Sequence, residues 1–156
     1  MKAKELMTKV VYSIKGQKSL HEAAKLMWEH DCGWLPVLDQ DGRLTATITD
    51  RDIAMAAYLN GDRLEDIPVD KAKSKSVVSC AQSDDIDSIE KTMQTFQLRR
   101  LPVVDKHSRV VGVISINDLS LAFHDGKKGV DALGVSETLA AICSHEHVYP
   151  QVAGTA

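Results

Sequence analysis

The sequence has few cross-linking residues and lacks the long apolar runs that span a bilayer. Its 156 residues include three cysteines, Cys32, Cys80 and Cys143, which are widely separated and form no C-x-x-C pair. We therefore expect no disulfide framework and no structural zinc site, only reduced and mostly buried thiols. The longest apolar run, residues 53–59, is far shorter than the roughly 20 residues that a transmembrane helix needs.

An excess of basic residues is also missing. The formal net charge is −3, which gives no electrostatic footprint for duplex nucleic acid. Charged residues start at Lys2, before an apolar signal segment can form. With 44% hydrophobic residues the chain can bury a sizeable core. These features predict a globular cytoplasmic protein that binds neither nucleic acid nor membrane.

Catalytic and metal-binding patterns are absent as well. The sequence has no H-E-x-x-H, no Walker loop, no G-x-G-x-x-G and no recognisable order of nucleophile and base. His145-Glu146-His147 suggests a metal site, but residues i and i+2 share a side only in an extended strand, and no third ligand is in sight. We favour a solvated tail there, and we expect no catalytic residue and no metal.

What the sequence does have is an internal repeat. Residues 35–39, Leu-Pro-Val-Leu-Asp, return 66 positions later as 101–105, Leu-Pro-Val-Val-Asp. The same offset aligns Thr49 with Ser115 and Asp52 with Asp118. Two copies in one register indicate a supersecondary unit used twice, with the function between the copies.

Each copy changes its hydrophobic period in the same order. A short β-branched run is followed by a helix, then by two strands joined by a turn, then by a second helix. Ser19-x-x-Glu22 is a capping box that starts a helix reaching about His30. In the second copy Ile86, Ile89, Met93 and Phe96 form the inward stripe of the equivalent helix. The predicted strands are 10–14, 35–39 and 44–49, then 76–80, 101–105 and 110–115, and the later helices are 52–58 and 118–123.

These patterns predict an α/β fold in which two pseudo-symmetric β-α-β-β-α units pack as one module. We expect the first unit over 1–61, a charged surface connector over 62–75 and the second unit over 76–125. An extra helix to about Cys143 and a frayed tail from Ser144 complete the chain at 126–156.

The repeated unit with L-P-V-h-D, a turn and h-x-G/A-h-h-[ST]-x-x-D resembles a tandem pair of cystathionine-β-synthase (CBS) domains. The resemblance covers roughly residues 1–125. It implies that the segments 44–53 and 110–119 are those that hold adenosine nucleotides in ligand-binding family members.

Two functions are open for Thr49-x-x-Asp52 and Ser115-x-x-Asp118. The pattern is a capping box, because a hydroxyl and a carboxylate three residues apart satisfy the first amides of a helix. The same groups can bind a ligand, since an ionised Asp accepts both hydroxyls of a ribose and a hydroxyl beside a helix N-terminus suits a phosphate or sugar oxygen. The two functions are compatible.

By resemblance, the rest of each pocket comes from the first strand and from the residues before L-P-V. This implies one set near Ser115 and Asp118, and a pseudo-symmetric set near Thr49 and Asp52. Arginine matches phosphate oxygens bidentately, so we expect three arginines to bind phosphate, although Arg100 can equally pair with surface carboxylates. The first set is Val10, Tyr12, Cys32 and Gly33, the second is Ser76, Val78, Leu98 and Arg99, and the arginines are Arg51, Arg99 and Arg100.

The predicted function is thus a non-catalytic sensor of AMP, ADP or ATP that signals through its own dimer or another protein. Arg51 and Arg99 together would make the Asp52 site the tighter one. The resemblance also implies a homodimer stacked through helices, to which four side chains offer apolar surface: Met55, Tyr58, Phe96 and Phe123. The alternatives are a structural dimerisation module without ligand and a binder of NAD or S-adenosylmethionine.

Overall fold

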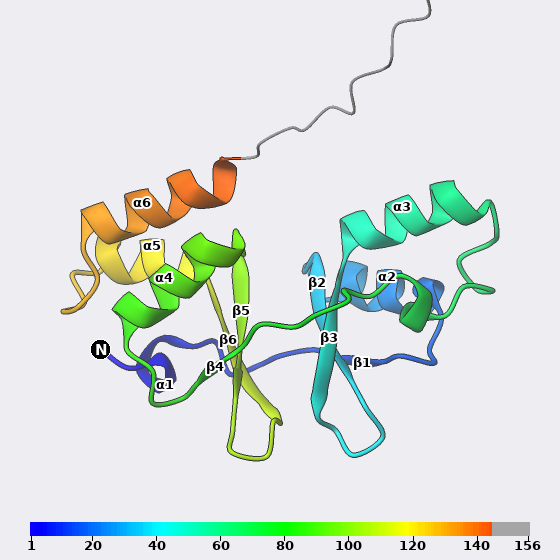
Figure 1. The fold of residues 1–156 in the computed structure, drawn as a ribbon, viewed down its shortest axis with the longest axis horizontal. Helices are drawn as coiled ribbons and strands as arrows, with labels where there is room; N and C mark the ends of the chain where they lie inside the picture. The colour runs from blue at the N-terminus through cyan, green and yellow to red at the C-terminus, as the bar shows by residue number, and fades with distance from the viewer. Residues whose placement is uncertain (145–156) are drawn as a thin grey trace, which may run out of the picture.

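The computed structural model describes residues 1–144 as two similar units side by side (Figure 1). Each unit has a three-stranded sheet, in which the first pair of strands is parallel and the second antiparallel. The sheet orders are β1-β2-β3 and β4-β5-β6. The first unit comprises β1 (Ile14–Lys15), α2 (Leu20–Glu29), β2 (Trp34–Leu38), β3 (Leu44–Thr49) and α3 (Asp50–Asn60). The second comprises β4 (Cys80–Ala81), α4 (Ile86–Phe96), β5 (Arg100–Val104), β6 (Val110–Ser115) and α5 (Ile116–His124).

Helix boundaries follow the capping signals in the sequence. Ser19 and Glu22 form the predicted capping box at the start of α2. Gly61 ends α3 in the left-handed conformation, with φ 69°, which glycine adopts without a Cβ clash. The predicted α/β class and the two repeated units are confirmed.

The first strand of each unit is shorter than the β-branched runs predicted. The predicted strands 10–14 and 76–80 are wrong, because pairing within each unit begins only at Ile14 and Cys80. The residues before them cross to the opposite unit instead. Backbone hydrogen bonds of 2.9 and 3.0 Å join Thr8 to Val113 of β6, and β-propensity cannot show which sheet a segment joins.

Each unit has its own apolar core between its sheet and its helices. The connector was predicted to be a surface link, which is wrong for Ile67 and Val69, because both are buried in the core of the first unit. A short 3-10 helix, η1 (Val69–Lys71), holds this part of the connector in place. Phe96 was predicted to face inward but is 55% exposed, since α4 ends there.

Two further helices add to the second unit. The short α1 (Ala3–Leu6) contacts α5 and β6, and α6 (Ala132–Cys143) lies across α4 and α5 (Figure 1). The predicted C-terminal helix is confirmed, whereas the predicted tail beyond Ser144 lies outside the described residues. No helix within residues 1–144 is long and apolar enough to cross a membrane.

Candidate functional site

The two strand-to-helix turns have the same hydrogen bonds. Asp52 Oδ2 accepts hydrogen bonds from Thr49 N at 2.8 Å and Thr49 Oγ1 at 2.7 Å, and Asp52 N donates to Thr49 Oγ1. Asp118 Oδ2 likewise accepts from Ser115 N at 2.7 Å and from Ser115 Oγ. Both predicted capping boxes are confirmed, and each such cap stabilises its helix by about 1 kcal/mol.

The second carboxylate oxygen distinguishes the two turns. Asp118 Oδ1 accepts a hydrogen bond of 3.0 Å from Thr8 Oγ1, which belongs to the crossing N-terminal segment. Within residues 1–144, no donor pairs with Asp52 Oδ1. The turn in the first unit therefore has an unoccupied acceptor oxygen, whereas the corresponding oxygen of Asp118 is already occupied by Thr8.

Each turn also receives a segment that crosses from the other unit. Thr8 pairs with Val113 of β6, and Ser74 pairs with Thr47 of β3 through Ser74 N and the Thr47 carbonyl at 2.8 Å. Ser74 lies 66 positions after Thr8, and Val113 lies 66 after Thr47, so the crossing is pseudo-symmetric. It brings the chain leading to residues 10–12 to β6, and the chain leading to 76–78 to β3.

The residues of these crossing segments differ in exposure. Val10 and Ser76 are exposed, and Val78 is half-buried against the core of the second unit. The Tyr12 ring stacks on the His30 ring, with centroids 3.5 Å apart and planes at 8°. Tyr12 thus lies against the end of α2.

The residues before each L-P-V lie beside the turn of their own unit. The carbonyl of Gly33 accepts from Asp50 N at 3.2 Å, and the carbonyl of Arg99 accepts from Ile116 N at 3.1 Å. The expected placement of Cys32 and Gly33 beside the Ser115 turn, and of Leu98 and Arg99 beside the Thr49 turn, is corrected here. The antiparallel register is the reason, because it pairs the first residue of β2 or β5 with the last residue of β3 or β6.

Two of the predicted phosphate-binding arginines gather at the turn of the second unit. Arg99 and Arg100 line a cavity of about 350 Å³ together with Ser115 and Asn117, and α6 closes one side of it. Arg51 is exposed at the start of α3. The positive charge is therefore concentrated at the Ser115 turn, and Arg99 does not join Arg51 at the Thr49 turn.

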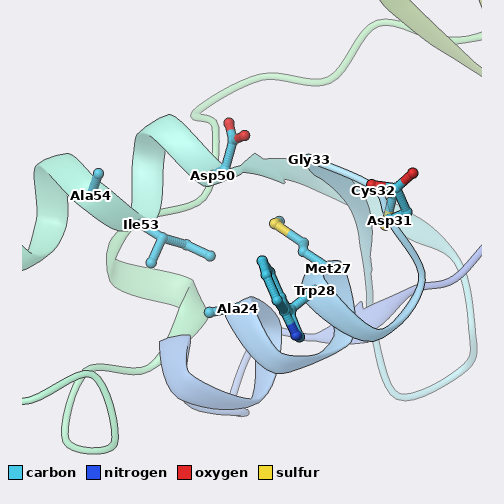
Figure 2. A pocket seen from close by; sticks show the side chains of 9 residues that line it. All are labelled: Ala24, Met27, Trp28, Asp31, Cys32, Gly33, Asp50, Ile53 and Ala54. Carbon is cyan, nitrogen blue, oxygen red and sulfur yellow. The ribbon is translucent and has the colours of Figure 1, made fainter.

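A second cavity, of about 430 Å³, lies between α2 and α3 of the first unit (Figure 2). Cys32, Gly33 and Asp50 border it beside the Thr49 turn. Sequence reasoning missed its apolar walls, because two helices paired in space leave no spacing signal in the chain. These walls are Ala24, Met27, Trp28, Ile53 and Ala54.

The three cysteines do not form a disulfide. All three are free thiols, and burial raises the pKa of Cys80 to about 12, so this thiol stays protonated and unreactive. Across residues 1–144, no group of three or more side chains has the arrangement of a metal site. The His145-Glu146-His147 pattern lies outside the described residues.

Comparison with known proteins gives one family. A sequence model of the CBS domain matches residues 3–58 and 65–125. The CBS domain-containing protein YhcV of Bacillus subtilis (strain 168) is 35% identical over 118 residues, which cover 76% of this chain and 82% of YhcV. The L-aspartate semialdehyde sulfurtransferase of Methanocaldococcus jannaschii is 31% identical over 125 residues, 80% of this chain but 23% of that enzyme.

A solved structure agrees with these relatives. The CBS domain pair of protein MJ0100, in complex with 5′-methylthioadenosine and S-adenosyl-L-methionine, has a TM-score of 0.72 and 27% identity. The match covers 81% of this chain and 98% of that one. The repeat, the twin capped turns and these likenesses lead to one conclusion: the chain belongs to the CBS domain family and carries two such domains in tandem.

Proposed function

We propose that the chain is a regulatory module that binds an adenosine nucleotide, AMP, ADP or ATP, and catalyses no reaction. The observation that carries this proposal is the pair of turns, each with a hydroxyl and a carboxylate at the start of a helix. The unoccupied Oδ1 of Asp52 suits a ribose hydroxyl, because an ionised carboxylate is a strong acceptor. Nucleotide binding would change how the chain acts on its target, either through its own dimer or through contact with another protein.

The two sites would not be equivalent. Arg99 and Arg100 beside Ser115 favour a phosphate-bearing ligand in the second unit, since guanidinium groups match phosphate oxygens. The Asp52 turn has a free acceptor and a single nearby arginine, so it relies more on the ribose. The sequence predicted that the Asp52 site is the tighter one. For phosphate binding we propose the opposite order. S-adenosylmethionine stays as an alternative, because the CBS domain pair of MJ0100 is in complex with 5′-methylthioadenosine and S-adenosyl-L-methionine. NAD stays as an alternative because it contains the same adenosine group.

A purely structural module is the second candidate function. One observation favours it: both capping boxes are complete without a ligand, so Thr49, Asp52, Ser115 and Asp118 already have a role in folding. Such a module needs no adenosine contact. It differs from a sensor in one measurable respect, because only a ligand that binds the folded state raises the melting temperature.

Thermal unfolding of the ligand-free protein decides between the two. We expect one or more of AMP, ADP, ATP, NAD and S-adenosylmethionine at millimolar concentration to stabilise the protein. A hundredfold excess over Kd adds roughly 2.7 kcal/mol, which corresponds to about 5–10 °C for a chain of this size. Cytidine monophosphate, which has the ribose and phosphate without adenine, is the matched control. An unchanged melting temperature with all five adenosine compounds would leave the structural function.

A further inference from the structure

One buried carboxylate in the second unit is not part of the proposed binding site. Glu90 on α4 is 9% exposed, and its buried Oε1 atom has no hydrogen-bond partner among residues 1–144. A buried carboxylate without a partner is unfavourable when ionised, and such groups take up a proton instead. The equivalent residue in the first unit is Ala24, so the repeated fold itself does not need a carboxylate at this position.

The helix α6 covers Glu90. It lies across α4 and α5 (Figure 1), and the backbone of its Gly134 faces the carboxylate. A Cβ at position 134 would lie 2.6 Å from Glu90 Oε2, so a larger residue there would push the carboxylate aside. One turn further along both helices, Gln94 Nε2 donates a hydrogen bond of 2.9 Å to Thr138 Oγ1. The contact between α4 and α6 therefore contributes to the burial of Glu90.

The charged groups that act on Glu90 are negative and come from both helices. Burial is the main reason why the pKa of Glu90 is raised, and three carboxylates raise it further: Asp131 at the cap of α6, Asp87 on α4 and Glu137 on α6. In the part of the chain that the structure describes, no lysine, arginine or histidine forms a salt bridge with Glu90. Glu90 therefore ionises more easily when α6 is away from α4, because its carboxylate then meets water.

The same helix forms one wall of the cavity at the Ser115 turn. Leu139 and Ile142 of α6 line this cavity of about 350 Å³ together with Arg99 and Arg100. Ile142 is also buried in the core of the second unit, so the end of α6 is anchored there when the helix is in place. Movement of α6 away from α4 would remove this wall from the cavity.

We propose that α6 is a pH-dependent lid on the second unit, held closed by the protonated side chain of Glu90. With Glu90 protonated, α6 stays on α4 and closes one side of the cavity of Arg99 and Arg100. When Glu90 loses its proton, the contact between the helices weakens and the cavity opens on that side. Since the closed state binds the proton more tightly than the open state, a rise in pH shifts the equilibrium toward the open state.

Hydrogen exchange of the backbone amides in the ligand-free protein measures this opening. Exchange rates of residues 132–143, corrected for the intrinsic effect of pH, give an opening constant for α6, and the amides of β5 report global unfolding. We expect α6 to exchange faster than β5. Between about pH 5 and about pH 8 the opening constant should rise with pH, by up to about tenfold per pH unit, because one proton is released.

Two variants test whether Glu90 is the group that titrates. Glu90→Gln keeps the shape of the side chain but binds no proton, so its opening constant should change by less than about twofold over the same pH range. Glu29→Gln is the matched control, because Glu29 is an exposed glutamate at the end of α2, where it lies 3.8 Å from Lys25 Nζ. This control should keep the pH dependence of the parent.

Three results would each overturn the proposal. The first is an opening constant of the parent that does not change with pH, which tests the proposal even without a variant. The second is a Glu90→Gln protein that keeps the pH dependence of the parent. The third is exchange of the α6 amides only together with those of β5. None of these measurements contains a nucleotide, so the lid can fail while the proposed function stands.

Discussion

Replacing Asp52 with asparagine separates ligand binding from helix capping. Asp52 Oδ2 accepts two hydrogen bonds from Thr49, and an asparagine carbonyl oxygen can accept both. The other oxygen, Oδ1, has no donor within residues 1–144, and asparagine replaces it with an NH₂ group that donates. The substitution therefore keeps the cap of α3 and removes the acceptor that we propose for a ribose hydroxyl.

The magnitudes of the two effects differ. Asn and Asp rank close together as N-terminal helix residues, so we expect the stability of the ligand-free protein to change by less than about 0.5 kcal/mol. A hydrogen bond to a charged group contributes roughly 1.5–3 kcal/mol, which is about 10- to 150-fold in Kd. At Asp118 the ligand already competes with Thr8, so Asp118→Asn should cost less, about 2- to 10-fold.

Calorimetric titration with the nucleotide that gives the largest thermal shift measures these differences. Asp131→Asn is the matched control, because Asp131 accepts a hydrogen bond from Gly134 N at the start of α6, away from both turns. An Asp52→Asn protein that keeps its affinity within twofold would refute the role of Asp52 in binding. So would a loss of stability in the ligand-free variant as large as its loss of binding energy.

Three further outcomes follow from the structure. Thr8→Val frees Asp118 Oδ1 and should tighten binding at the second site by about 2- to 10-fold in the same titration; weaker binding would contradict the competition. Glu90→Gln should raise the free energy of unfolding at pH 7 by about 1–3 kcal/mol, measured by urea denaturation, because it removes a negative charge that burial and nearby carboxylates make unfavourable. Burial and nearby carboxylates raise the folded-state pKa of Glu90, so the folded protein binds this proton more tightly than the unfolded chain does. Stability should accordingly fall as pH rises from the ordinary glutamate value through the raised one, and Glu90→Gln should lack this fall; an identical pH profile would show that the shift is absent. Gly61→Ala should lower stability by about 1 kcal/mol in thermal melts because φ is 69° there, and an unchanged melt would show that the end of α3 relaxes.

The order of elements could be predicted from the sequence because its signals are local. The capping boxes at Ser19, Thr49 and Ser115 define helix starts through contacts three residues apart. The repeated apolar Leu-Pro-Val runs, each followed by a turn, predict the central strand of each sheet. The 66-residue offset implies two equivalent units, and the family follows from motifs that occur in both.

Tertiary structure alone decided which groups come together. The crossing of Thr8 to Val113 and of Ser74 to Thr47 depends on pairing with a sheet more than 25 residues away, which no local pattern specifies. The same holds for the placement of Arg99 beside Ser115, which comes from the antiparallel register. The sequence alone determined the chemical groups at both turns, since they lie three residues apart. Long-range packing decides which of their oxygens are free and which are occupied, so this became visible only in the folded chain. The same is true of the cavity between α2 and α3.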